Sequence, residues 1–201
     1  MIFEPTRLPG LFVVRAEKLA DSRGFFARLW CEQEFAAAGL AFRPTQISLS
    51  SNRRAGTLRG LHWQADAHAE TKLVRATRGR IFDVAVDLRP GSETFGRWFG
   101  RELDAEDGAA LLIPAGFAHG FVTITDNAEV TYLIDVPFVP DAAQGARYDD
   151  PAFGIMWPLA PRVISSRDLE WPAFGRSADG PATGPGTGPG TGRVPGTGAP
   201  G

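Results

Sequence analysis

Cysteine is nearly absent from this chain of 201 residues, in which Cys31 is the only one. A disulfide framework is therefore excluded, and a reducing compartment fits. The sequence also has no apolar run of the roughly 18 residues that a membrane span needs. Its first residues carry neither the basic nor the apolar segment of a signal peptide. We expect a cytoplasmic protein that does not associate with a membrane.

Charge of one sign is not in excess either, because 21 lysines and arginines stand against 23 aspartates and glutamates. A nucleic-acid-binding protein normally carries a basic face, so nucleic acid is not an expected partner. A glycine-rich phosphate loop, a cysteine pair and a nucleophile elbow are also missing. The basic residues that cluster within 53–59 and 72–80 indicate solvated strand faces or a small anion pocket.

Composition divides the chain into two parts. The chain as a whole is 43% hydrophobic and 22% charged, which is ordinary for one globular domain with a sizeable core. From Gly175 to Gly201, however, glycine, proline, threonine and alanine dominate. Such a segment cannot bury enough apolar surface to offset the entropy lost on ordering it. We therefore predict one domain over residues 1–174 and a disordered tail over residues 175–201.

Short alternating runs separated by turn residues predict a fold that is mostly β. In residues 80–88, apolar side chains occupy every second position, which is typical of a strand. The dipeptide Arg78-Gly79 precedes this run and predicts a tight hairpin turn. One short helix is expected over residues 32–38, ending at Gly39. Many short strands at close spacing favour a β-sandwich or a barrel, whose mouth would supply a pocket.

Histidine is scarce, and the chain contains only His62, His68 and His119. His62 belongs to an apolar, strand-like run over residues 58–64 that also includes Arg59. Burying polar groups without partners is unfavourable, so this run is a candidate site. If the run is extended, His62 shares a strand face with Leu58 and Gly60, and the glycine leaves room for a ligand.

Lys72 and Tyr132 each alternate with small or branched apolar residues, which is the pattern of an interior strand face. Each of them could instead reach the rim with its polar end or make one structural hydrogen bond. Together with His62 they indicate a site, because a small barrel has little room for unrelated interior charges.

Four other polar residues have simpler interpretations. His119 follows a Pro-Ala-Gly turn, where a hydrogen bond could fix the turn, and His68 lies in a polar loop. Asp168 by itself indicates a carboxylate in a surface turn. We interpret Cys31 as a small buried hydrophobic residue rather than as a nucleophile.

Seven stretches of sequence occur in the order and spacing of a known family. They are DSRGFF (21–26), GTLRGLH (56–62), KLVR (72–75), RGRIFDVAVD (78–87), GSETFG (91–96), IPAGFAHGF (113–121) and DDP (149–151). On these motifs, residues 1–174 resemble the dTDP-4-dehydrorhamnose 3,5-epimerases. The resemblance implies an all-β, cupin-type jelly-roll barrel with one or two short helices.

The resemblance also implies an activity. The protein would be a homodimer that inverts C3, C5 or both of a dTDP-linked 4-keto-6-deoxyhexose in deoxysugar biosynthesis, with neither metal nor organic cofactor. His62 would be the general base, oriented by Asp168, and Tyr132 the acid on the opposite face of the sugar. Lys72 would stabilise the enolate oxygen. Further substrate contacts would come from Arg23, Gln46, Ser48, Arg59, Asp83, His119, Phe138 and Arg167.

These residue types suit that reaction. A ketone at C4 acidifies the protons on C3 and C5, because the carbanion delocalises onto oxygen, and inversion needs one group on each face. Imidazole, with a reference pKa of about 6.5, is a competent base near neutral pH, and a phenol, with a reference pKa of about 10, can donate. A lysine charge at the developing oxyanion stabilises the transition state more than the ground state.

Four positions depart from the pattern of the family. Phe138 replaces a tyrosine that stacks on thymine, and Ser48 replaces an asparagine. Arg28 and Ala143 each stand where a ligand-contacting glutamate is usual. The catalytic positions are intact, so these departures concern the exact substrate more than the type of reaction.

The sequence is also compatible with three other functions. A metal-dependent cupin would need His68 beside His62 and His119, since Gln64 replaces the second histidine of the usual pair. A sugar-nucleotide-binding protein could keep the barrel without turnover. A 3,4-ketoisomerase would share both the barrel and the keto-sugar substrate.

Overall fold

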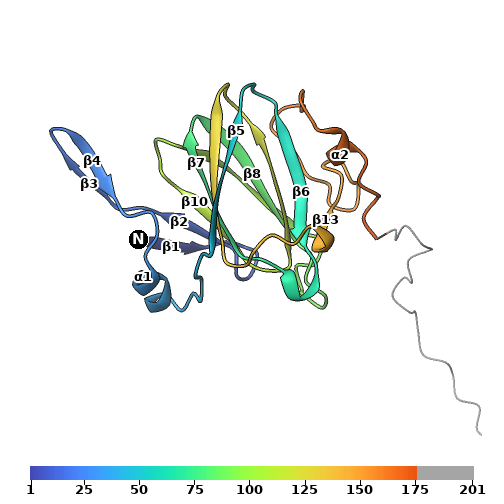
Figure 1. The fold of residues 1–201 in the computed structure, drawn as a ribbon, viewed down its shortest axis with the longest axis horizontal. Coiled ribbons are helices and arrows are strands. Elements are labelled where there is room, and N and C mark those ends of the chain that lie inside the picture. Colours follow the sequence, from blue (N-terminus) through green and yellow to red (C-terminus); the bar gives the residue numbers. More distant parts are fainter. Residues whose placement is uncertain (176–201) are drawn as a thin grey trace, which may run out of the picture.

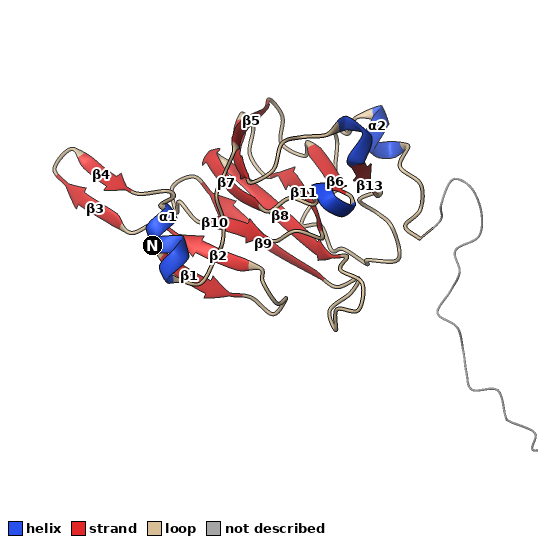
Figure 2. Cartoon of the chain, turned by 60° about the horizontal axis from the view of Figure 1, so that its bottom comes forward, coloured by secondary structure: helices blue, strands red, loops and turns tan. Residues whose placement is uncertain are grey.

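The computed structural model describes residues 1–175, and their fold is built almost entirely from strands. Two sheets enclose a common core, and a short hairpin stands apart from them (Figures 1 and 2). The helices are short: α1 (Glu32–Ala37), α2 (Ser166–Leu169) and the 3₁₀ helices η1 (Asp66–His68) and η2 (Pro140–Ala142). Among these residues, no helix is both long and apolar enough to cross a membrane.

Antiparallel pairing orders the strands within both sheets. The six-stranded sheet runs β1 (Ile2–Pro5), β2 (Phe12–Arg15), β10 (Ala110–Ile113), β7 (Lys72–Arg78), β12 (Ala128–Ile134) and β5 (Gln46–Asn52). The five-stranded sheet runs β13 (Ala143–Gly145), β6 (Leu58–Gln64), β11 (Phe117–Thr123), β8 (Arg80–Asp87) and β9 (Trp98–Asp104). This arrangement confirms the predicted all-β, cupin-like barrel.

Strand β8 confirms the alternation read from the sequence. Ile81 and Ala85 belong to the core between the two sheets. Val84 and Val86 point the other way, into a second apolar cluster that includes Phe153 from the C-terminal segment. The apolar face that the sequence indicated is therefore covered by this second cluster, while the inward face also buries Asp83 and Asp87.

The turn at Arg78-Gly79 is not the hairpin that the sequence predicted. β7 pairs with β10 and β12 in one sheet, while β8 pairs with β9 and β11 in the other. Gly79 has a φ of 66°, and a Cβ there would collide with Thr125 Oγ1. The glycine therefore turns the chain from one sheet to the other. Turn residues mark a reversal, whereas pairing depends on which strand faces are buried together.

Two predictions about chain organisation have different outcomes. The helix expected over residues 32–38 is present as α1, and Gly39 follows it with a φ of 74°. The predicted tail lies outside the described residues, except for Gly175. A feature that the sequence did not predict is the hairpin of β3 (Lys18–Asp21) and β4 (Gly24–Ala27), which projects from the barrel (Figure 1).

Candidate active site

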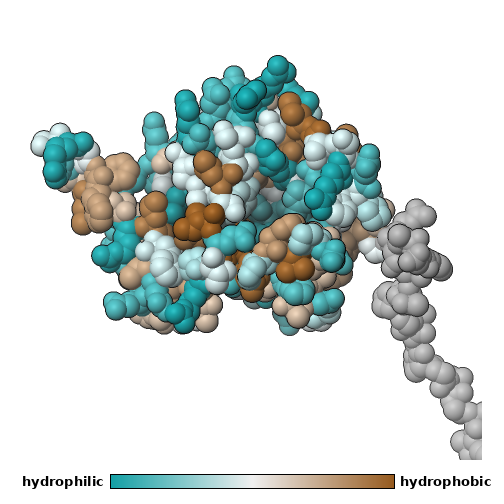
Figure 3. All heavy atoms as spheres, viewed as in Figure 1, coloured by the Kyte–Doolittle hydropathy of each residue, from teal (hydrophilic) through white to brown (hydrophobic). Residues whose placement is uncertain are grey.

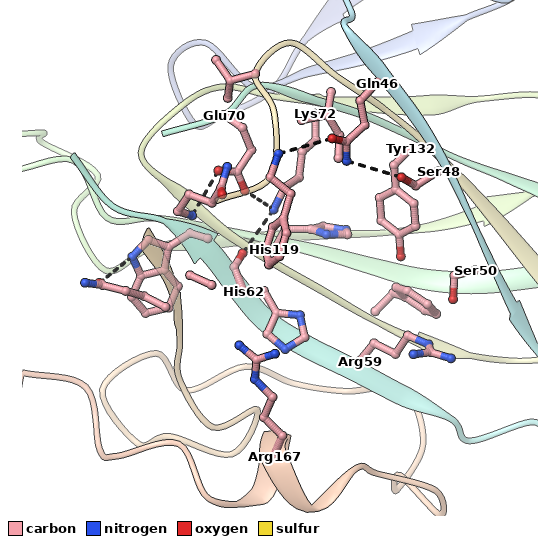
Figure 4. A pocket seen from close by; sticks show the side chains of 18 residues that line it. Gln46, Ser48, Ser50, Arg59, His62, Glu70, Lys72, His119, Tyr132 and Arg167 are labelled. Atoms are coloured by element: carbon pink, nitrogen blue, oxygen red, sulfur yellow. Dashed lines mark hydrogen bonds and ion pairs between the residues drawn. The ribbon is translucent and has the colours of Figure 1, made fainter. Parts of the chain in front are cut away.

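A cavity of about 340 Å³ lies between the two sheets. Of the predicted residues, those that line it are Gln46, Ser48, Arg59, His62, Lys72, His119, Tyr132, Phe138 and Arg167 (Figure 4). His62 stands on β6 of the five-stranded sheet, and Tyr132 stands on β12 of the six-stranded sheet. An imidazole and a phenol therefore enter the same space from opposite walls.

A bulge in β6 brings Arg59 and His62 into the cavity together. Residues three positions apart point to opposite faces of a regular strand. Here the register between β6 and β11 shifts by one residue around Gly60-Leu61, so that both side chains line the cavity. The prediction that His62 shares its face with Leu58 is therefore wrong, although the glycine inside the strand was a signal of the bulge.

Gly60 is needed for close packing of two strands rather than for a ligand. Its φ is 125°, and a Cβ would lie 2.5 Å from Gly120 Cα and 2.9 Å from His119 O. Neighbouring backbone fills the space beside Gly60, so the prediction that this glycine leaves room for a ligand is wrong. A larger residue would push β6 away from β11 and displace His62, two positions along the strand.

Asp168 holds His62 in place. His62 Nε2 lies 2.6 Å from Asp168 Oδ1, and the backbone N–H of Gly60 donates to Asp168 Oδ2 at 3.4 Å. The interpretation of Asp168 as a surface carboxylate is wrong, because its side chain on α2 is buried beside β6. Burial alone would raise the pKa of Asp168, but the hydrogen bond and charge of His62, together with hydrogen bonds to Gly60 and Ser165, outweigh it and lower that pKa. The carboxylate therefore stays ionised and orients the ring.

Tyr132 stands on the opposite wall and packs against the core between the sheets. Its ring meets that of His119 nearly edge to face, with 5.9 Å between the centroids. Burial raises the pKa of the Tyr132 phenol above its ordinary value, and the negative charge of Asp83 adds to this effect. The phenol therefore stays protonated well beyond neutral pH, as a proton donor must.

Asp83 lies behind His119 and does not line the cavity. His119 Nε2 lies 2.7 Å from Asp83 Oδ1, and the carboxylate is fully buried. The partner of His119 is thus on the neighbouring strand β8, and the interpretation that this histidine fixes its own turn is wrong. Asp83 is placed to orient His119 rather than to touch a ligand in the cavity.

Glu70 is a buried acidic residue in the cavity wall that sequence reasoning missed. Its Oε1 lies 2.6 Å from Lys72 Nζ, and its Oε2 accepts the backbone N–H of Gln64 at 3.1 Å. In the sequence, Glu70 is the last residue of a polar segment, residues 65–70, for which an exposed loop is predicted. Only its position two residues before Lys72 could have indicated the pair.

The loop that carries Phe138 is fixed by two glutamines. The backbone N–H of Phe138 donates to Gln46 Oε1 at 3.3 Å. Gln64 holds both neighbours, since its Nε2 donates to Pro137 O at 3.3 Å and its Oε1 accepts the Val139 N–H at 2.6 Å. The exposed Phe138 ring is therefore held at the cavity, and Gln64 is a second residue that the sequence did not assign to the site.

Arg23 and Arg28 lie away from the cavity of their own chain. Arg23 is in the turn of the projecting hairpin and pairs with Asp21 at 2.5 Å. Arg28 pairs with Glu34 at 2.9 Å. Ala143, by contrast, lines the cavity, so the carboxylate that is usual at this position is missing from the wall.

The metal-dependent alternative required three histidines together. His68 lies on η1 and is not among the residues that line the cavity with His62 and His119. Within residues 1–175, no group of three or more histidine, cysteine, aspartate or glutamate side chains is placed to hold a metal ion.

The fold and the cavity define a cupin-like barrel with an imidazole–carboxylate pair on one wall and a phenol on the other. The sequence profile of the dTDP-4-dehydrorhamnose 3,5-epimerases matches residues 5–176. This chain belongs to that family of isomerases.

Individual relatives agree with this assignment. A dTDP-4-dehydrorhamnose 3,5-epimerase from Sinorhizobium fredii is 40% identical over 178 residues, which cover 86% of this chain and 89% of the relative. A solved structure of a dTDP-6-deoxy-D-glucose-3,5-epimerase from Legionella pneumophila, in complex with dTDP-4-keto-L-rhamnose, has a TM-score of 0.79 at 35% identity and covers 84% of this chain and 89% of that one. A 3'-monoepimerase from Streptomyces bikiniensis, in complex with dTDP-quinovose, has a TM-score of 0.79 at 31% identity and covers 85% of this chain and 86% of that one.

Proposed function

We propose that this protein converts dTDP-4-dehydro-6-deoxyglucose to dTDP-4-dehydrorhamnose by inverting C3 and C5, as a cytoplasmic step of deoxysugar biosynthesis. The observation that carries the proposal is the entry of His62 and Tyr132 into one cavity from opposite sheets. Family membership supports the reaction, and the dTDP-linked sugars bound in two solved relatives support the class of substrate.

His62 takes the proton from C3 or C5, and the electron pair of the broken C–H bond delocalises onto O4 as an enolate. Asp168 keeps the imidazole in position during this transfer. Lys72 places a positive charge at the oxygen where negative charge develops. Tyr132 then donates its proton to the same carbon from the opposite face, so the new C–H bond has the inverted configuration. Both groups recover their starting protonation by exchange with water.

The nucleotide end of the substrate lies against Arg59, Arg167 and the loop that carries Phe138. Arg59 Nε donates to Asn52 Oδ1 at 2.8 Å, which leaves its two terminal nitrogens for the diphosphate. Arg167 joins it from α2, and the Phe138 ring stacks on the base. Gln46 and Ser48 contact the same end of the substrate from β5. These groups perform the reaction with neither metal nor organic cofactor.

The enzyme acts as a homodimer in which the hairpin of one chain reaches the cavity of its partner. Large apolar side chains stay exposed on the hairpin and on the edge strand β5 of the single chain (Figure 3). They are Leu19, Phe25, Phe26, Ile47 and Leu49. Exposed apolar patches of this kind mark protein interfaces. Arg23 lies in the same hairpin, so its expected contact with the nucleotide needs a second chain.

Mixed dimers test this arrangement. Arg23→Ala and His62→Ala chains, each weakly active alone, should regain activity when they are unfolded together and refolded as a mixture. A mixed dimer then contains one site with its own His62 and the arginine of the other chain. If Arg23 served only its own chain, no complete site could form and the mixture would stay inactive. Light scattering on the same samples checks that dimers are present.

Solvent exchange tests the reaction itself. The wild-type enzyme is incubated in D₂O with dTDP-4-dehydro-6-deoxyglucose, and deuterium is located by NMR. Label at both C3 and C5, with the rhamno configuration in the product, is the expected result. Label at C3 alone would contradict the double inversion. Movement of the carbonyl to C3 would instead identify a 3,4-ketoisomerase, and binding without exchange would identify a non-catalytic binding protein.

A further inference from the structure

We propose that Glu70 is a positioning residue for the epimerisation, because it holds Lys72 so that one ammonium N–H points at the enolate oxygen. The inference rests on the proposed function. It deepens that function by adding a residue that no sequence pattern assigned to the reaction.

The contacts of Lys72 leave a single N–H for the substrate. An ammonium group has three donors. Glu70 Oε1 lies 2.6 Å from Nζ, and the carbonyl oxygen of His62 accepts from Nζ at 3.4 Å. Two of the N–H groups therefore point at the Glu70 and His62 oxygens, and the tetrahedral geometry of the ammonium nitrogen then fixes the direction of the third N–H. Lys72 lines the cavity beside them, so this remaining donor is available to an oxygen bound there (Figure 4).

Glu70 is itself fixed, which makes it a rigid support. Its side chain is only 5% exposed, and its second oxygen accepts the backbone N–H of Gln64 at 3.1 Å. Gln64 and His62 are both on β6, so the strand that carries the base also anchors the carboxylate. The base and the ammonium group are therefore positioned by the same strand.

The charge of Glu70 matters as well as its shape. The Lys72 side chain is 11% exposed, and a buried ammonium group without a counterion is strongly unfavourable. With Glu70 beside it, the pair is neutral before substrate binds. Without Glu70, the flexible lysine stem would move its ammonium group towards other acceptors, and misplacement by about 1 Å lowers a rate by up to about 10²-fold.

Glu70→Gln tests the proposal, because it keeps the size of the side chain and removes its charge. We expect kcat to fall about 10–100-fold while KM changes less than about threefold, since the enolate forms only during the reaction. Glu70→Asp keeps the charge on a shorter stem and should recover part of the loss. Glu102→Gln is the matched control, because its partner Arg80, at 2.8 Å, forms an exposed pair outside the cavity.

A double-mutant comparison separates positioning from general structural damage. If Glu70 acts through Lys72, adding Glu70→Gln to Lys72→Met should change kcat/KM by less than about twofold, because the group being positioned is already gone. Losses that multiply would overturn the proposal. Thermal unfolding of each variant identifies those that fold. If Glu70→Gln does not fold, Glu70→Asp decides, and a folded aspartate variant with wild-type kcat would overturn the role.

The same experiments distinguish this inference from the proposed function. A wild-type enzyme that neither exchanges nor inverts its substrate contradicts the function. An active wild-type enzyme whose folded Glu70→Gln variant keeps its kcat contradicts only the role of Glu70.

Discussion

His62→Ala is expected to slow deuterium exchange at C3 and C5 by about 10²–10⁴-fold, the usual contribution of a positioned acid or base. Alanine keeps the backbone of β6 but removes the nitrogen that takes the proton. The contact of 2.6 Å with Asp168 shows why the effect should be large, since the ring is oriented before the substrate arrives. The measurement is the initial rate of label entry by NMR, compared with the wild-type enzyme under the same conditions.

His68→Ala is the matched control for this change. It removes the same side chain from an exposed position on η1, which does not line the cavity, and should leave exchange unchanged. Circular dichroism and thermal unfolding would establish that both variants are folded. Exchange at the wild-type rate in a folded His62→Ala protein would show that another group removes the proton.

Tyr132→Phe should separate exchange from inversion. His62 can still remove a proton, exchange it with solvent and return deuterium to the same face, so label should enter within a few-fold of the wild-type rate. Inversion should fall by about 10²-fold or more, because the opposite face has lost its donor. Since burial raises the pKa of this phenol, the wild-type donor is fully protonated at neutral pH. NMR of the same reaction reports both the label and the configuration.

Tyr148→Phe is the natural control, because the chain contains only these two tyrosines. Tyr148 does not line the cavity, so its hydroxyl should contribute to neither rate. Equal and small effects of Tyr132→Phe on exchange and on inversion would exclude Tyr132 as the acid on the opposite face.

Local features of the structure could be predicted from the residues that form them. The short helix ends before Gly39 because glycine adopts positive φ at no steric penalty. β8 shows a two-residue period because successive side chains of a strand point to opposite faces. The same rule correctly placed Lys72 and Tyr132 on inward faces, where both line the cavity.

Features that depend on two distant segments could not be predicted in this way. Asp168 is in contact with a histidine 106 positions away, and nothing in its own neighbourhood indicates this. The sequence around Glu70 indicates an exposed loop residue, and only the folded structure shows its contacts with Gln64 and Lys72. Arg23 had an expected role in ligand binding, but it is not among the residues that line the cavity of its own chain.

The strand content, the period of β8 and, through the motifs, the family all follow from the order of the residues, because each depends on side-chain types along one continuous stretch. The separation of β7 and β8 into different sheets, the bulge of β6 at Gly60-Leu61 and the ion pair of Glu70 with Lys72 emerge only in the folded chain. Pairing, register and buried charge depend on which surfaces are covered together, and those surfaces come from residues far apart in the chain.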